Sequence, residues 1–468
     1  MRPSLPLVVA LAVAGCVAPG PVSDAPVEGL VGAVVPGFVQ EHDHADPALH
    51  AFSQGLEEVA YHAMVPGEDG AGAEARGGAW LNSELVVRGS TAFVAYLGAP
   101  WLVGAVDVSD PSAPKLLDAL EFSNAWGMDV TASDDGAWIY VSVYPGAVGT
   151  LFDPRYVLEN VQRPDAAALP GVAIVDARDP SKLALAGFHP IHGLGPHTAV
   201  YHRYADGREV VFADKADAPG GNGIVALEVV PTPTGGRALR PVSFFALEGP
   251  LEGTFPHDVH VQEHPLDGRT LLYAAWWDNG LVVLDVSDPA KPTLVSRFDG
   301  IPRGEEVQLH DVHPFPRLVA GRHYTLSGPE IPGGDTSGHL RVYDTTDPAA
   351  PSLVGSWILP GEFVVDSPFL FSVHNFDFLP DGRVALAHGH AGVWIVDWLG
   401  PGGVEAPDPA WMAAPRAVGY DVPHPEGAAA PVWSPVAGVP WMWGTAVGPD
   451  GTVWAVDVVS GLHALRVS

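Results

Sequence analysis

A strand–turn–strand unit recurs along this chain and constrains its fold more than any other feature. Each copy is a β-rich apolar run, a polar turn that contains Asp-Pro, and a second apolar run. The clearest copies are GAVDVSDPSAPKLL (104–117), VAIVDARDPSKLAL (172–185), LVVLDVSDPAKPTLV (281–295) and LRVYDTTDPAAPSLV (340–354). Proline suits the turn because it fixes φ and lies outside the hydrogen-bonded ladder, and the preceding acid can accept hydrogen bonds from backbone N–H groups of the turn. The pattern predicts an all-β repeat architecture.

Two weaker copies complete the series, IVALEVVPTPTGG (224–236) and VWIVDWLGPGG (393–403). These segments resemble the LVIVD repeat, which is characteristic of a bacterial β-propeller family, and the resemblance covers most of residues 57–468. It implies a propeller fold and carries little information about activity, because propellers support many unrelated functions.

Alignment on the turns predicts seven four-stranded blades, with each turn joining the third and fourth strands. The innermost strands are then expected near residues 83–88, 128–132, 197–202, 257–262, 310–315, 374–378 and 443–448. The last blade has only three strands before Ser468. We expect LEEVAYHAMV (56–65) to supply its outer strand, because this pairing removes an open sheet edge and closes the ring. The propeller domain is therefore predicted to span residues 56–468.

The first residues have the pattern of a bacterial export signal. MRPSLPLVVALAVAGC (1–16) has an early Arg2, an apolar run and small residues before Cys16, the only cysteine of the chain. Its end resembles the lipobox, in which the cysteine is lipid-modified and becomes the first residue of the mature protein. The resemblance implies a lipid-anchored protein of the cell envelope outside the cytoplasm, and Val17 favours the outer membrane. Residues 17–55 have no sustained period and are expected to form a flexible tether.

Histidine recurs at one position of the predicted innermost strands. Four successive blades have His197, His257, His310 and His374 there, whereas the flanking blades have Met128 and Gly444. Since innermost strands surround the central channel, the four imidazoles are expected at one level, where they can share one metal ion. Imidazole suits iron, copper and zinc. A purely structural role, with each ring bonded to water or backbone, fits the same residues, and duplication alone can copy a histidine from blade to blade.

Other residues are expected near the same mouth of the channel. His388 and His390 end a second strand, His192 lies in a loop at the mouth, and Trp443 adjoins the histidine level. Insertions at about 145–169 and 325–338 follow second strands and are expected to cover this mouth. Asp258 and Asp311 point to the other side of their strands, so they can act only as outer partners of a histidine on the next blade. His202, His260 and His313 are expected to pack between blades.

Charge and motifs limit the functional classes. The net charge of −32 disfavours binding to nucleic acid. The motifs of serine hydrolases, zinc proteases and nucleotide-binding proteins are absent from the sequence. We expect a membrane-anchored binding protein, whose rim recognises a small molecule or another protein and whose histidines hold a metal. The alternative is a metal-dependent oxidase or oxygenase that uses the same four histidines. In geometry alone, this set resembles the iron site of carotenoid-cleaving oxygenases and the site of selenium-binding-type methanethiol oxidases.

Overall fold

A computed structural model describes most of the propeller and little of what precedes it. The described residues are 33–34, 53–64, 82–97, 101–122, 125–145, 170–191, 195–215, 221–249, 254–298, 308–329, 338–359, 372–422, 441–458 and 460–468. Cys16 with the predicted signal, most of the predicted tether, His192, and most of both predicted insertions lie outside these residues.

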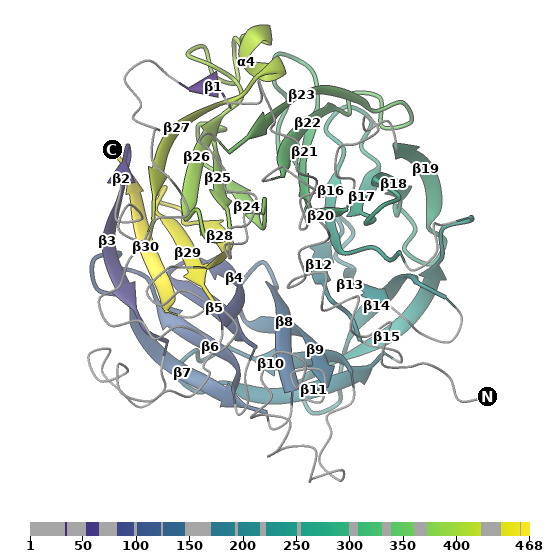
Figure 1. Cartoon of the computed structure of the whole chain (residues 1–468). Coiled ribbons are helices and arrows are strands. Elements are labelled where there is room, and N and C mark those ends of the chain that lie inside the picture. Colours follow the sequence, from purple (N-terminus) through teal and green to yellow (C-terminus); the bar gives the residue numbers. More distant parts are fainter. Residues whose placement is uncertain are drawn as a thin grey trace, which may run out of the picture.

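Seven antiparallel sheets surround a central axis, as Figure 1 shows, so the prediction of seven blades is confirmed. The strands of each blade are given from the innermost outward. Blade 1 comprises β4 (Asn82–Arg88), β5 (Thr91–Tyr96), β6 (Trp101–Asp107) and β7 (Lys115–Glu121), and blade 2 comprises β8 (Ala125–Ala132), β9 (Trp138–Pro145), β10 (Gly171–Asp176) and β11 (Ala184–Pro190). Blade 3 comprises β12 (Ala199–Arg203), β13 (Glu209–Lys215), β14 (Gly223–Pro231) and β15 (Arg237–Phe245). Blade 4 comprises β16 (Asp258–Glu263), β17 (Thr270–Ala275), β18 (Leu281–Asp285) and β19 (Thr293–Phe298). Blade 5 comprises β20 (Leu309–Pro314), β21 (Tyr324–Pro329), β22 (His339–Asp344) and β23 (Ser352–Ile358).

The last two blades include strands from the N-terminal part of the chain. Blade 6 comprises β24 (Phe376–Phe378), β25 (Val384–Ala387), β26 (Val393–Asp397) and β27 (Arg416–Asp421), with the short helix α4 (Pro409–Ala413) before β27. Two short strands of the predicted tether, β1 (Ala33–Val34) and β2 (Ser53–Gln54), pair with β27. Blade 7 comprises β28 (Met442–Val447), β29 (Val453–Asp457), β30 (Gly461–Val467) and β3 (Leu56–His62). The antiparallel pairing of β3 with β30 confirms closure of the ring by the N-terminal strand.

The Asp-Pro turns join third and fourth strands as predicted, and their acids cap the turn. Asp110, Asp179, Asp288 and Asp347 each accept a hydrogen bond on Oδ1 from the backbone N–H two residues on, at 3.0–3.1 Å. The pairing that follows each turn shifts register by a β-bulge, and the same shift recurs between the third and fourth strands of blades 1 to 6. Each bulge increases strand twist, which suits the outer edge of a blade.

The core lies between blades rather than inside one sheet. Every apolar cluster of the described residues contains buried side chains from adjacent blades, such as Leu272 of blade 4 with Phe212 of blade 3. Leu56 of β3 packs in the cluster between blades 6 and 7. Each blade is therefore stable only against its neighbours, which is why the closing strand matters.

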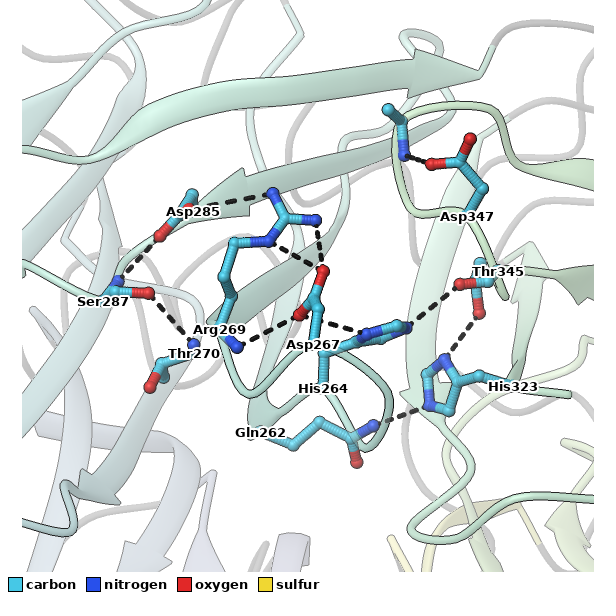
Figure 2. A network of polar contacts seen from close by, with 11 residues as sticks. Gln262, His264, Asp267, Arg269, Thr270, Asp285, Ser287, His323, Thr345 and Asp347 are labelled. Atoms are coloured by element: carbon cyan, nitrogen blue, oxygen red, sulfur yellow. Dashed lines mark hydrogen bonds and ion pairs between the residues drawn. The ribbon is translucent and has the colours of Figure 1, made fainter. Parts of the chain in front are cut away.

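Blades 4 and 5 also share a buried polar network, drawn in Figure 2. His323 Nδ1 lies 2.9 Å from Thr345 Oγ1, and its Nε2 lies 2.7 Å from Gln262 Nε2 and 3.1 Å from the Phe315 carbonyl oxygen. His264 Nε2 lies 3.3 Å from the Thr345 carbonyl oxygen. These are structural histidines, because their ring nitrogens are engaged within the protein.

Candidate functional site

The four predicted histidines lie next to one another on four successive blades. The ring centroids are 3.9 Å apart for His197–His257, 4.3 Å for His257–His310 and 3.9 Å for His310–His374. All four side chains are buried. His257 directly precedes β16, His197 and His374 lie two residues before β12 and β24, and His310 is the second residue of β20. We call this set the histidine arc.

Backbone contacts hold the strand starts that carry the arc. His257 N–H donates to the Ala275 carbonyl oxygen at 2.8 Å, and His374 N–H donates to the Ala387 carbonyl oxygen at 3.0 Å. Beside His197, Thr198 Oγ1 donates to the His257 carbonyl oxygen at 2.9 Å, which links blades 3 and 4. The arc is therefore placed by regular strand pairing and an inter-blade bond.

Aromatic side chains border the arc at both ends and behind it. Tyr144 contacts His197 edge-on at 6.0 Å, and Trp443 lies 4.3 Å from His374 between ring centroids. Trp277 lies 5.1 Å from His257. These rings exclude water from the imidazoles, which strengthens any interaction of their lone pairs with a cation.

His310 at the centre of the arc has no hydrogen-bond partner on either ring nitrogen, although its side chain is only 2% exposed. Burial holds the pKa of His310 well below its ordinary value, and the neighbouring imidazoles of His374, His257 and His197 lower the pKa further. The ring is therefore neutral at physiological pH. A neutral imidazole with free lone-pair capacity is the form that binds metal ions.

No three His, Cys, Asp or Glu side chains among the described residues have donor atoms that already converge on one metal position. The ring spacings are somewhat tighter than those of a metal-bound set. With a metal–nitrogen distance of about 2.1 Å and about 1.2 Å from nitrogen to ring centroid, neighbouring ligands at right angles have centroids ~4.7 Å apart and opposite ligands ~6.6 Å apart. The arc has neighbours at 3.9–4.3 Å and the His197–His310 pair at 6.5 Å. To bind one ion, the rings must rotate and neighbouring rings must separate by ~0.4–0.8 Å.

The two predicted outer carboxylates do not contact the arc's ring nitrogens. Asp311 reaches the next blade, where its Oδ2 accepts from the Phe376 N–H at 2.9 Å, and its Oδ1 lies 3.3 Å from His313 Nε2. Asp258 Oδ1 accepts from the Val259 N–H at 2.6 Å. Burial and the adjacent Asp311 raise the pKa of Asp258 well above its ordinary value. Asp258 lines the central channel beneath the arc, whereas Asp311 is fully buried between blades 5 and 6.

The remaining described candidates differ in their distance from the arc. Trp443 contacts it directly, and a run of rings continues from Trp443 to Trp441 at 5.7 Å and to His390 at 5.5 Å. His388 lies elsewhere, fully buried and 6.0 Å edge-on from Trp357. Burial lowers the pKa of His388 to about 3. An isolated bridge between Gly389 and Met442 places this loop at the start of β28, the same end of the blades as the arc.

A cavity of about 590 Å³ occupies the central channel beneath the arc. His202, His260 and His313 line this cavity, a position that the sequence did not indicate. The rings of His260 and His313 are 4.9 Å apart. This contact joins the neighbouring blades 4 and 5, as expected from the sequence for these two rings.

Fold and site together define a seven-bladed β-propeller with a buried arc of histidines on four consecutive blades. Two segments, residues 83–119 and 271–300, match the model of the LVIVD repeat, which confirms the resemblance seen in the sequence. No curated protein matches the chain.

Solved structures share the propeller fold at low sequence identity. The periplasmic gluconolactonase PpgL of Pseudomonas aeruginosa is similar over 83% of this chain and 99% of its own, with 14% identity and a TM-score of 0.50. Sqt1 of Saccharomyces cerevisiae is similar over 83% of this chain and 85% of its own, with 9% identity and a TM-score of 0.48. At 14% identity, the likeness to PpgL shows the fold alone. In the described part of the chain, no helix has the length and apolarity needed to cross a bilayer.

Proposed function

We propose that this propeller is a metal-binding protein of the bacterial cell envelope, which holds one iron, copper or zinc ion on the histidine arc. The observation that carries the proposal is His310, a buried imidazole that lacks a hydrogen-bond partner on both nitrogens and touches two further members of the arc. Leaving a buried polar group unsatisfied costs about 1–3 kcal/mol, and a shared cation offsets that cost.

The contrast with His323 supports this reading. Both side chains are buried, but His323 bonds to protein groups through both nitrogens, as a structural histidine should. Equivalence by duplication explains why histidine recurs, but not why four rings remain in contact without bonding partners for His310. A metal ion bound by several of these rings accepts a lone pair from each of them.

Four neutral ligands leave the charge of the metal uncompensated, so the bound ion would favour an anion, water or dioxygen at an open position. This property suits a binding protein that captures a small molecule. We propose that the rim of the propeller next to the histidine arc recognises a small molecule or a protein partner. Oxidase or oxygenase activity is the second candidate, and a redox-active metal with dioxygen reactivity would select it.

The envelope location rests on Cys16, which we propose carries the lipid anchor of the mature protein. Replacement by serine removes the thiol that receives the lipid. Cells that express the Cys16→Ser variant should release the protein from the membrane fraction and fail to label it with a fatty-acid probe. Membrane retention of the variant would contradict the anchor.

The metal site is tested on protein that lacks residues 1–16. The protein is stripped with chelator, titrated separately with Zn²⁺, Cu²⁺ and anaerobic Fe²⁺, desalted and analysed for metal content. We expect one equivalent of the preferred ion in the unsubstituted protein. The His257→Ala/His310→Ala variant should retain none, and His189→Ala, on outer strand β11, should bind normally.

Failure of the unsubstituted protein to retain any of the three ions would overturn the proposal, as would unchanged binding by the double variant. Thermal unfolding of each variant separates loss of the site from loss of the fold. His310→Gln serves as a second variant, because it keeps polarity and similar volume while removing the imidazole.

A further inference from the structure

The cavity beneath the histidine arc has a composition unlike that of the arc. It is lined by innermost-strand residues of all seven blades and extends from Asp258 and Asn375, which directly follow members of the arc, to strand ends such as Glu263 and Arg203. Its volume of about 590 Å³ lies within the range of small-molecule sites. The cavity is therefore large enough for a ligand and not merely for a bare ion.

Among the charged side chains of the wall, acidic groups outnumber basic ones. Six carboxyl groups line the cavity, against the guanidinium groups of Arg88 and Arg203: Glu84, Asp129, Asp134, Asp258, Glu263 and Asp377. Arg88 Nη1 donates back to the Val87 carbonyl oxygen at 2.9 Å. An excess of carboxyl groups in a low-dielectric channel favours a cation, because a nearby positive charge stabilises their ionised form.

Backbone N–H groups of the next blade hold two of these carboxyl groups, since Asp129 accepts from Ala199 N–H and Asp377 accepts from Val447 N–H. Burial and then the charge of Asp129 raise the pKa of Glu84 well above its ordinary value. Burial also raises the pKa of Asp129 to about 6 and that of Asp377. Glu84 Oε1 is buried and has no hydrogen-bond partner. Glu84 Oε1 occupies the space next to Gly444, because a Cβ added to Gly444 would lie 2.5 Å from this oxygen.

The spread of the carboxyl groups indicates the shape of the ligand. Glu84, Asp129, Asp258 and Asp377 come from blades 1, 2, 4 and 6, around the circumference of the channel. A sphere of this volume has a diameter of ~10 Å, whereas oxygen ligands approach Ca²⁺ or Mg²⁺ to about 2.0–2.6 Å, so a single ion cannot contact opposite walls. An extended molecule with a positive group at each end can contact carboxyl groups on opposite walls.

We propose that the central channel binds a small organic cation with two or more ammonium groups, such as a linear polyamine. Each ammonium group donates charge-assisted hydrogen bonds to the carboxylates of different blades, and the Glu84 side chain, which lines the cavity, is one of the acceptors. Tyr201, whose ring stacks on Tyr140, also lines the cavity and supplies an aromatic surface for the methylene segments or an ammonium group. The site is separate from the histidine arc and does not depend on a bound metal.

Titration calorimetry with spermidine tests the proposal on chelator-treated protein that lacks residues 1–16, at pH 7.5 and low salt. We expect one saturable site, no heat with the uncharged 1,6-hexanediol, and at least ~10-fold weaker binding in the Glu84→Gln/Asp377→Asn variant, which loses two charged contacts. Both substitutions keep size and hydrogen-bonding capacity, and Asp129→Asn provides an independent variant if the pair fails to fold.

The net charge of −32 makes nonspecific attraction of polyamines the main competing explanation. Asp110→Asn/Asp179→Asn changes the net charge equally at exposed turns, and this control should bind spermidine like the unsubstituted protein. Equal weakening in the control and channel variants would overturn the proposal. So would unchanged affinity in the channel variant, or displacement of spermidine by equimolar Ca²⁺, which would indicate an ion site.

Discussion

Closure of the ring by β3 can be tested at Leu56, the first residue of that strand. Its side chain is 1% exposed and packs between blades 6 and 7 with neighbours that include Leu379, Val393 and Leu465. The residue pairs with Val467 at the end of β30. Replacement by alanine removes buried methyl groups and leaves a cavity at the seam between the two ends of the propeller.

Leu→Ala replacements in packed cores cost about 2–5 kcal/mol, and we expect ~3 kcal/mol here because the site is fully enclosed. Unfolding entropy of about 2.1 cal/mol/K per residue gives ~0.8 kcal/mol/K for a domain of about 400 residues, so the melting temperature should fall by ~4 °C. Differential scanning calorimetry and urea unfolding followed by tryptophan fluorescence both measure this change.

Leu294→Ala is the matched control, because Leu294 lies on the outermost strand β19 and is 48% exposed. It should change the unfolding free energy by less than about 0.5–1 kcal/mol. If Leu56→Ala were as mild as this control, β3 would not be a structural part of blade 7 and the closure argument would fail.

Three further outcomes are expected. Burial and the charge of Glu58 raise the pKa of Asp421 to about 7, so the folded state holds a proton that the unfolded state releases from about pH 4. Asp421 should therefore make the free energy of unfolding decline as pH rises from 4 to 7, and Asp421→Asn should lessen this decline by ~1–3 kcal/mol in urea unfolding at pH 4.5 and 8. Gly355→Ala should destabilise by about 1–3 kcal/mol in calorimetry, because a Cβ would lie 2.3 Å from the Met412 carbonyl oxygen; a melting temperature unchanged from the unsubstituted protein would contradict this packing of α4 on β23. Tyr61→Phe removes the hydroxyl that donates to the Ser460 carbonyl oxygen at 2.5 Å and should cost ~1 kcal/mol, with no effect on metal content.

The blade architecture could be predicted from local patterns. Asp-Pro turns mark the third-to-fourth strand connection because proline and a capping acid are favoured in that turn, and Asp110 and Asp179 cap it as expected. Counting the repeats then placed His197, His257, His310 and His374 at one level, since equivalent residues of a cyclic repeat lie at equivalent depth. The ring contacts between them follow from that equivalence.

The direction of individual side chains could not be predicted in the same way. A strict two-residue alternation turns His313 away from the histidine arc, but it does not show that His313 lines a cavity lower in the channel. Register irregularities at the starts of β4, β8, β20 and β28 break the alternation, and they arise where each innermost strand pairs with its neighbour.

The sequence by itself determined the seven blades, the seam closed by residues 56–62 and the common level of four histidines, because each depends on a repeated local pattern and on chain order. Only the tertiary structure decided that acidic groups of separate blades face one cavity and that Glu84 occupies the space left by Gly444. The physical reason is that these contacts join residues hundreds of positions apart, through strand twist and bulges that no local pattern encodes.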